Sequence, residues 1–407
     1  MRELDIVLFG ATGFVGRLVA AHFAEHAPDG VRIALAGRSE EKLAALRADL
    51  GERAAAWAVI VADVGDEPAL ARMARSTRVV ATTAGPYLRY GLPVVHACAE
   101  AGTDCIDLSG EVLFVRRCID ELDETARRTG ARIINSCGFD SIPSDLGVLL
   151  VAGRARADGA GELTATTLVV RSIRGGVSGG TIDSLRAQTE LSGADRDLRR
   201  LLADPYGLSP ARGDDPDAQG ERDDLGVRND PDVGWTGPFV MAGYNTRIVR
   251  RSNALQGHVY GRGFRYREVM GFGRGRTAPI MAGAATAGLG LFAAAMGRPA
   301  TRKLLDRVLP APGEGPSEKR RTSGRFRMEV RTITTTGKRY ASTVAAKGDP
   351  GYAATAVMFA ESALTLVLDH DRLPAAAGVL TPATGLGLPL VDRLRAAGMT
   401  LSVRELD

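Results

Sequence analysis

An apolar run near the N-terminus leads directly into a spaced set of glycines. Ile6 to Phe9 predict a buried strand, and a helical stretch follows as far as His26. In a strand–turn–helix unit of this kind, the glycines permit a tight turn, close approach of a phosphate and close packing of the helix. The free N–H groups and the dipole of the helix then attract an anion. The sequence therefore predicts a site for the pyrophosphate of a dinucleotide, formed by Gly10, Thr12, Gly13, Phe14, Val15 and Gly16.

The end of the second predicted strand indicates which dinucleotide is bound. The strand ends in Gly37, Arg38 and Ser39. Enzymes that use NAD usually have an acidic residue here, which binds the ribose 2′-hydroxyl. A guanidinium instead pairs well with a 2′-phosphate. We therefore predict NADPH as the cofactor. Asp63, which ends the third strand, is either part of the adenine side or a surface acid.

The loop after the fourth predicted strand consists of small residues. In this type of sheet, that loop lies beside the nicotinamide ribose. We expect it to contact the cofactor through Thr83, Ala84, Gly85 and Pro86. Two roles are open for Tyr87, which follows: its phenol donates a proton in catalysis, or its ring only packs against the cofactor.

The sixth predicted strand runs into a segment of polar residues. Cys137, Asp140 and Ser141 follow the strand, at the edge of the sheet where ligands bind in such folds. We expect Cys137 to contact the cofactor, and Asp140 and Ser141 to be candidate catalytic residues. Ser144 or Asp145 is expected to cap the helix that follows.

The order of elements predicts an α/β protein with two domains. Short apolar strands alternate with helices in the first part, which is typical of a doubly wound parallel sheet, the Rossmann fold. We predict an NADP-binding Rossmann domain over residues 1–150. A second α/β (α+β) domain with an open sheet, for substrate binding or dimerisation, is expected over 151–347, with a mobile loop at 204–237. Residues 348–407 are expected to form a helix and tail that pack back on the first domain.

One segment of the second domain, residues 279–297, contains no charge. Arg274 and Arg276 precede it, and Arg298, Arg302 and Lys303 follow it. Its length is near the lower limit for crossing a bilayer. We expect a buried helix, or one that lines an apolar pocket, and contact with a membrane surface stays open as an alternative.

Composition excludes several classes of function. The net charge is +4 and aromatic residues make up 5%, too few for a surface that stacks nucleic-acid bases. The four cysteines form no C-x-x-C pair, and the five histidines do not have the spacing of metal ligands. A strand begins within the first residues, so we expect no signal peptide. These features favour a reduced, cytoplasmic protein without a metal, either free or peripheral at the inner face of the membrane.

Several motifs together resemble a known family. Besides the glycine turn, they include Asp107-Leu108-Ser109-Gly110-Glu111, Asn245-Thr246-Arg247-Ile248-Val249-Arg250-Arg251-Ser252-Asn253-Ala254 and Gly348-Asp349-Pro350-Gly351-Tyr352. They are similar to segments of the saccharopine dehydrogenase-like oxidoreductases, in the actinobacterial branch that contains the trans-acting enoyl reductases. The resemblance covers nearly the whole chain.

The resemblance implies an NADPH-dependent enoyl reductase of polyketide or lipid biosynthesis. Its substrate would be an α,β-unsaturated acyl thioester carried on an acyl carrier domain. Two alternatives stay open: a reductase of the same fold that acts on another lipid-like carbonyl or imine, and a non-catalytic, membrane-associated protein that binds NADPH. The identity of the proton donor and the existence of a homodimer also stay open.

Overall fold

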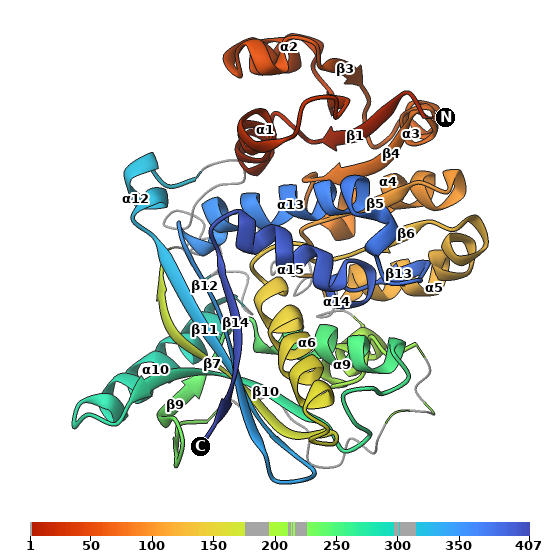
Figure 1. The fold of residues 1–407 in the computed structure, drawn as a ribbon. Helices are drawn as coiled ribbons and strands as arrows, with labels where there is room; N and C mark the ends of the chain where they lie inside the picture. Colours follow the sequence, from red (N-terminus) through yellow and green to blue (C-terminus); the bar gives the residue numbers. More distant parts are fainter. Residues whose placement is uncertain are drawn as a thin grey trace.

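The computed structural model describes residues 2–175, 195–210, 213, 215, 226–296, 301 and 315–407. These residues form two seven-stranded sheets with helices packed against them (Figure 1). The first sheet is parallel throughout, in the order β13-β6-β5-β4-β1-β2-β3. The prediction of a doubly wound parallel sheet near the N-terminus is confirmed.

The strands of the first sheet are short and mostly apolar. They are β1 (Leu4–Phe9), β2 (Ile33–Gly37), β3 (Ala58–Val61), β4 (Thr77–Thr82), β5 (Asp104–Ile106), β6 (Arg132–Ile134) and β13 (Gly378–Leu380). The helices between them are α1 (Phe14–His26), α2 (Glu40–Asp49), α3 (Glu67–Ser76), α4 (Tyr87–Ala101) and α5 (Val112–Thr129). Successive side chains of a strand point to opposite faces. In β1, therefore, Ile6 and Leu8 enter one hydrophobic core while Val7 and Phe9 enter the other.

The second sheet is mixed, in the order β14-β12-β11-β7-β10-β9-β8. Its strands are β7 (Leu163–Arg174), β8 (Arg228–Asp230), β9 (Gly234–Pro238), β10 (Arg265–Gly273), β11 (Arg325–Thr334), β12 (Arg339–Lys347) and β14 (Thr400–Leu406). Helix α6 (Ile142–Ala157) packs on one face of it. Close packing requires Gly147, because a Cβ there would lie 2.8 Å from the side chain of Val330.

The remaining helices lie between and beside the sheets. They are α8 (Arg196–Ala203), α9 (Ala242–Leu255), α10 (Ala278–Met296), α12 (Glu318–Thr322), α13 (Thr355–Leu368), α14 (Pro382–Gly385) and α15 (Gly387–Ala396). Helix α9 packs against α6 and β10, so it lies where the two sheets approach each other (Figure 1).

The expectation of a loop over residues 204–237 is wrong in part. Strand β8 and most of β9 lie inside that range, and β9 pairs antiparallel with β10. Thr236 is fully buried in this pairing. The Asp, Gly and Pro residues around these short strands are typical of loops, so the composition of the segment does not reveal the strands. Residues 211–212, 214 and 216–225 of the predicted loop lie outside the described residues.

The C-terminal segment belongs to both halves of the molecule. Helix α13 packs against α1 and β4, and the His22 ring bonds to the Glu361 carboxylate at 2.8 Å in a buried contact. His22 is therefore a buried residue that joins α1 to α13. Strand β13 pairs with β6 in the first sheet, whereas β14 pairs with β12 in the second. The segment after residue 348 therefore packs on both sheets, and not only on the first domain as expected.

Helix α10 covers most of the charge-free segment, and it is largely exposed. Only Ala278, Ala282 and Met296 are buried. It projects from the edge of the second sheet near β9 (Figure 1). The expectation of a buried helix is therefore wrong, because the strands beneath α10 contact it along one narrow side. Gly297 and the basic residues that follow lie outside the described residues.

Candidate functional site

The glycine turn after β1 has the geometry that the sequence predicts. Gly10 has a φ of +82°, and its N–H donates to the carbonyl oxygen of Ala36 at 2.9 Å. A Cβ on Gly16 would lie 2.3 Å from the carbonyl oxygen of Gly10, so the first turn of α1 packs directly on the glycine turn. Gly13 precedes α1 and is exposed, and no side chain caps this helix. The uncapped N–H groups of the first turn are thus free to bind a phosphate.

The residues predicted for the adenosine end lie together at the ends of β2 and β3. The Arg38 Nε atom is 3.8 Å from an Asp63 carboxylate oxygen, and their side chains are 81% and 49% exposed. The guanidinium is therefore available to a ligand phosphate, because an exposed pair at this distance is weak. The Ser39 hydroxyl oxygen accepts a hydrogen bond from the Lys42 N–H and caps α2, which is a structural role. Gly37 is buried at the end of β2.

The loop after β4 lies against the glycine turn. Thr83 donates its N–H to the Phe9 carbonyl oxygen at 2.9 Å and its hydroxyl to the Gly10 carbonyl oxygen at 3.1 Å. Ala84 is half-buried and Gly85 is exposed, and Pro86 immediately precedes α4. The loop therefore lines the same edge of the sheet as the turn, as the sequence predicts for a contact with the cofactor.

Tyr87 does not point into an open cleft, contrary to its candidacy as proton donor. Its side chain is buried, and its hydroxyl donates to the Thr82 carbonyl oxygen at 3.0 Å. The same oxygen accepts a hydrogen bond from the Leu108 N–H at 3.1 Å. Burial, with the nearby Asp107 carboxyl, raises the pKa of the phenol well above its ordinary value. Tyr87 thus ties the β4 loop to the β5 loop and has no free proton to donate.

The segment Asp107–Glu111 after β5 holds the neighbouring loops in place. The Glu111 carboxylate accepts hydrogen bonds from the N–H groups of Tyr87 and Leu88 at 2.9 and 2.7 Å, and so caps the start of α4. The Asp107 carboxylate accepts bonds from the Asn135 amide and the Ser136 N–H at 2.6 and 2.9 Å. Even with these donors, burial raises the pKa of Asp107. Both buried acids therefore position the loops of β4, β5 and β6.

Two residues after β6 are not at the site as expected. Cys137 is completely buried in the core, where burial raises the pKa of its thiol, so it does not contact a cofactor. Ser141 is also buried, and its hydroxyl donates to the Asn245 side-chain oxygen at 3.3 Å, which excludes it from contact with a substrate. Neither Ser144 nor Asp145 caps α6, which begins at Ile142; both lie inside its first turn.

Asp140 remains as the candidate catalytic residue of this loop. It is half-buried, and none of the described residues donates a hydrogen bond to its carboxyl. Its Oδ2 atom would lie 3.4 Å from a Cβ placed on Gly110, and Met241 borders the same position. Burial raises the pKa of Asp140 to about 6. A carboxyl with a pKa this close to neutral pH, and with no partner among the described residues, can donate a proton and is suited to general acid catalysis.

Helix α9 contributes residues that a reading of the first domain alone does not find. The Tyr244 hydroxyl bonds to the Ser136 hydroxyl, and Ser136 has a φ of 69°, which is uncommon for a residue other than glycine. Burial raises the pKa of Tyr244 well above its ordinary value. The only signal for this contact in the sequence is that Tyr244 directly precedes the Asn245–Ala254 motif.

A segment of the second domain also reaches the glycine turn. Gly315 packs on the Phe14 ring so closely that a Cβ would lie 2.1 Å from its edge. The Arg321 guanidinium lies 5.4 Å from the centre of the same ring, and the Tyr352 ring packs on it edge-on at 4.8 Å. The side chain of Phe14 therefore serves as the contact between the turn and residues from the second half of the chain.

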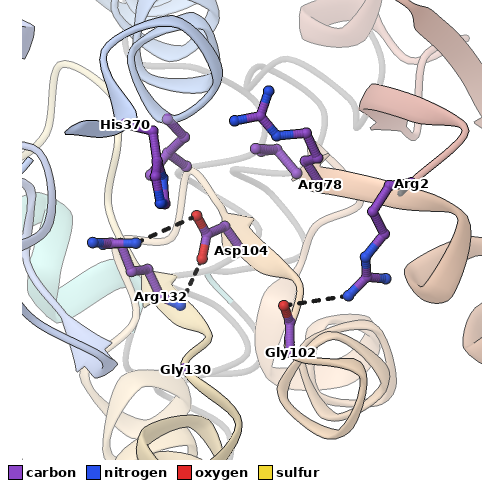
Figure 2. A pocket seen from close by; sticks show the side chains of 9 residues that line it. Arg2, Arg78, Gly102, Asp104, Gly130, Arg132 and His370 are labelled. Atoms are coloured by element: carbon purple, nitrogen blue, oxygen red, sulfur yellow. Dashed lines mark hydrogen bonds and ion pairs between the residues drawn. The ribbon is translucent and has the colours of Figure 1, made fainter.

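A small cationic cavity of about 200 Å³ lies at the opposite edge of the first sheet (Figure 2). Arg78, Asp104 and Arg132 line it from the beginnings of β4, β5 and β6. Arg2 donates to carbonyl oxygens at the ends of α3 and α4, and the Arg132 N–H donates to Asp104 at 2.8 Å. These arginines make hydrogen bonds that stabilise the fold, so the cavity is not assigned to the site. Among the described residues no group of acids, histidines and cysteines is arranged to hold a metal.

Comparison with known proteins identifies the first domain and the relatives of the whole chain. Residues 6–134 match the family described as the saccharopine dehydrogenase NADP binding domain. Trans-acting enoyl reductases of Mycobacterium tuberculosis (strain H37Rv) and Mycobacterium ulcerans (strain Agy99) are 49% and 47% identical to the chain. Both alignments cover 100% of this chain and 99% of the relative.

A solved structure shows the same fold at low sequence identity. Saccharopine dehydrogenase (L-Glu forming) from Saccharomyces cerevisiae superposes with a TM-score of 0.56 at 16% identity, over 99% of this chain and 100% of that one. The chain has an NADP-binding domain, a two-sheet fold of this kind and relatives of this identity along its whole length. It therefore belongs to the saccharopine dehydrogenase-like oxidoreductases, in the family of the trans-acting enoyl reductases.

Proposed function

We propose that this protein uses NADPH to reduce an α,β-unsaturated acyl thioester that a separate polyketide synthase carries on an acyl carrier domain. The observation that carries the proposal is the whole-length similarity to trans-acting enoyl reductases, together with a protonatable carboxyl, Asp140, at the edge of the sheet that holds the glycine turn. Other lipid-like carbonyl or imine substrates, and NADPH binding without turnover, are the alternatives to be tested.

The residues present fit the proposed cofactor. A side chain on Gly16 would collide with the backbone of the turn, Gly13 is exposed at the start of α1, and the first turn of α1 has no side-chain cap. Arg38 is exposed at the end of β2, where it would pair with the 2′-phosphate. The loop from Thr83 to Pro86 would lie beside the nicotinamide ribose. When bound, NADPH supplies the hydride that the β-carbon of the substrate receives.

The protein's own chemical contribution is a proton and a fixed geometry. Reduction of the double bond requires a hydride at the β-carbon and a proton at the α-carbon. We assign that proton to the Asp140 carboxyl, because it is half-buried, unpaired among the described residues and has a raised pKa. Gly110 leaves the approach to this carboxyl free of a side chain. Asp107 and Glu111 hold the loops on either side.

The pH dependence of the chemical step tests this assignment. A general acid must be protonated, so the single-turnover rate should fall about tenfold for each pH unit above the pKa of Asp140, which is about 6. Loss of NADPH absorbance is followed by stopped flow with an excess of enzyme over an enoyl-pantetheine thioester. In Asp140→Asn the rate should fall by about 10²–10⁴-fold and lose this dependence, since general acid catalysis contributes about that much.

Cofactor binding is measured separately on the same variants. Asp140→Asn should bind NADPH as the wild type does, because Asp140 is not assigned to the cofactor. A wild type that binds NADPH but oxidises it with neither a free nor a carrier-bound enoyl thioester would refute the enoyl reductase function. A variant that retains the wild-type rate and pH profile would instead refute only the role of Asp140.

A further inference from the structure

The exposed surface of α10 is unusual for a water-soluble protein. Ile280 and Leu291 are 73% and 72% exposed, and Met281 is 54% exposed. Within Ala278–Met296 no residue is charged. Monomeric soluble proteins rarely leave a continuous apolar surface of this kind in water, and such surfaces mark sites of protein or membrane contact.

One side of α10 is anchored to the second sheet. Ala282 is buried, and the helix packs against β9 and β10. The approach is close because β9 has Gly237 at the contact, where a Cβ would lie 3.1 Å from the Thr286 hydroxyl. Ile280 and Leu291 are separated by eleven positions, or about three helical turns, so they lie on one side of the helix about 16 Å apart along its axis. That side faces away from Ala282.

The polar groups of α10 are satisfied within the helix. Thr286 is its only residue with a polar side chain, and its hydroxyl donates to the Ala282 carbonyl oxygen at 2.8 Å. The helix therefore offers no unsatisfied side chain to hydrocarbon, where an unmade hydrogen bond is costly.

Positive charge is concentrated at the beginning of the helix. Arg274 and Arg276 are both exposed immediately before it, and no acidic residue occurs between Arg274 and Met296. The N-terminal end of a helix is itself the positive end of its dipole, so two arginines there repel the helix end. An anionic phosphate at the same place would interact favourably with both the arginines and the dipole.

From this combination we propose that α10 anchors the protein peripherally to a phospholipid membrane that contains anionic lipid. The side with Ile280 and Leu291 enters the boundary between headgroups and acyl chains, and Arg274 and Arg276 contact the anionic headgroups. The site is separate from the glycine turn and from Asp140. The α10 anchor would act whichever lipid-like substrate the protein reduces.

The test measures flotation of the full chain with vesicles. The wild type should float with vesicles of phosphatidylcholine and phosphatidylglycerol mixed in a ratio of about 7:3, as expected of a peripheral membrane protein. Ile280→Asp with Leu291→Asp should lower the partition coefficient at least about 100-fold, since burial of each side chain accounts for about tenfold or more. Arg274→Gln with Arg276→Gln should lower it about 25-fold, and only on vesicles with the anionic lipid.

A matched control replaces an exposed leucine elsewhere. Leu388 of α15 is 56% exposed, and Leu388→Asp should float as the wild type does. NADPH affinity should be unchanged in every variant, which shows that the fold is intact. Equal flotation of the wild type and the Ile280→Asp, Leu291→Asp variant would overturn the proposal. The proposal would also be overturned if the wild type were a dimer that does not bind vesicles and the double variant were a monomer. In that case a second copy of the chain would cover α10.

Discussion

Replacing Asp140 by asparagine should make the protein more stable at neutral pH, which is the opposite of what most buried substitutions do. Asn keeps the size of the side chain and removes its ionisation. The pKa of Asp140 rises from an ordinary 3.8 to about 6 because burial penalises the charged form. Since one pH unit corresponds to about 1.4 kcal/mol, the ionised carboxylate lowers the free energy of unfolding by about 3 kcal/mol at pH 7.

The difference should depend on pH in a defined direction. Below about pH 4 the carboxyl is protonated in both the folded and the unfolded chain, so Asp140→Asn and the wild type should be equally stable. Between about pH 4 and 6 the unfolded chain releases the proton first, and the wild type loses stability relative to the variant. Above the folded-state pKa of about 6 the full difference is present.

Urea unfolding followed by circular dichroism measures this effect at several pH values. Comparing the variant with the wild type removes the contribution of all other titrating groups. Asp145 provides the matched control, because its pKa is also about 6 but its carboxyl accepts hydrogen bonds from Ser252 and from the Ala383 N–H. Asp145→Asn should therefore destabilise the protein. If Asp140→Asn were less stable than the wild type at pH 7, the carboxylate would have a favourable partner, and both the physical reasoning and the assignment of a general acid would be wrong.

Three further substitutions test the other parts of the site. Arg38→Ala should raise the dissociation constant of NADPH about 10–100-fold and that of NADH only a few-fold, because a charge-assisted bond to phosphate is lost; equal changes in a fluorescence titration would contradict this role. Gly16→Ala should abolish NADPH binding, since its Cβ would lie 2.3 Å from the Gly10 carbonyl oxygen, whereas Gly153→Ala, where nothing lies within 4 Å, should bind normally. Tyr87→Phe should lower the free energy of unfolding by about 1–3 kcal/mol, because a buried N–H loses its acceptor; its single-turnover rate should stay within a few-fold of wild type, and a 100-fold loss would restore Tyr87 as proton donor.

The nucleotide-binding half of the site could be predicted because its signals are local. The spacing of Gly10, Gly13 and Gly16 specifies a backbone shape whatever the rest of the chain does. Arg38 follows directly from its position at the end of a strand. In each case the function depends on the backbone and on the nearest few residues, which a single sequence contains.

The catalytic half could not be predicted in the same way. Tyr87 and Cys137 both follow strands at the correct edge of the sheet, yet both are buried, since the direction of a side chain there depends on the loops that pack over it. Tyr244 arrives at the site from α9, far along the chain. Likewise, the apolar composition of α10 fits a buried helix and an exposed one equally well, because only the neighbouring strands decide how much of it is covered.

The placement of β13 and β14 constrains how the nascent chain can fold. The outermost strand next to β6 is supplied by residues 378–380, so the first sheet cannot be completed until those residues have been synthesised. Until then the edge of β6 presents unpaired backbone groups, the type of edge at which chains aggregate. Although the first domain begins near the N-terminus, its sheet is therefore expected to stay open at the β6 edge until residues 378–380 are available. A fragment that ends at residue 150 should dimerise or precipitate through the same edge rather than behave as an independent nucleotide-binding module.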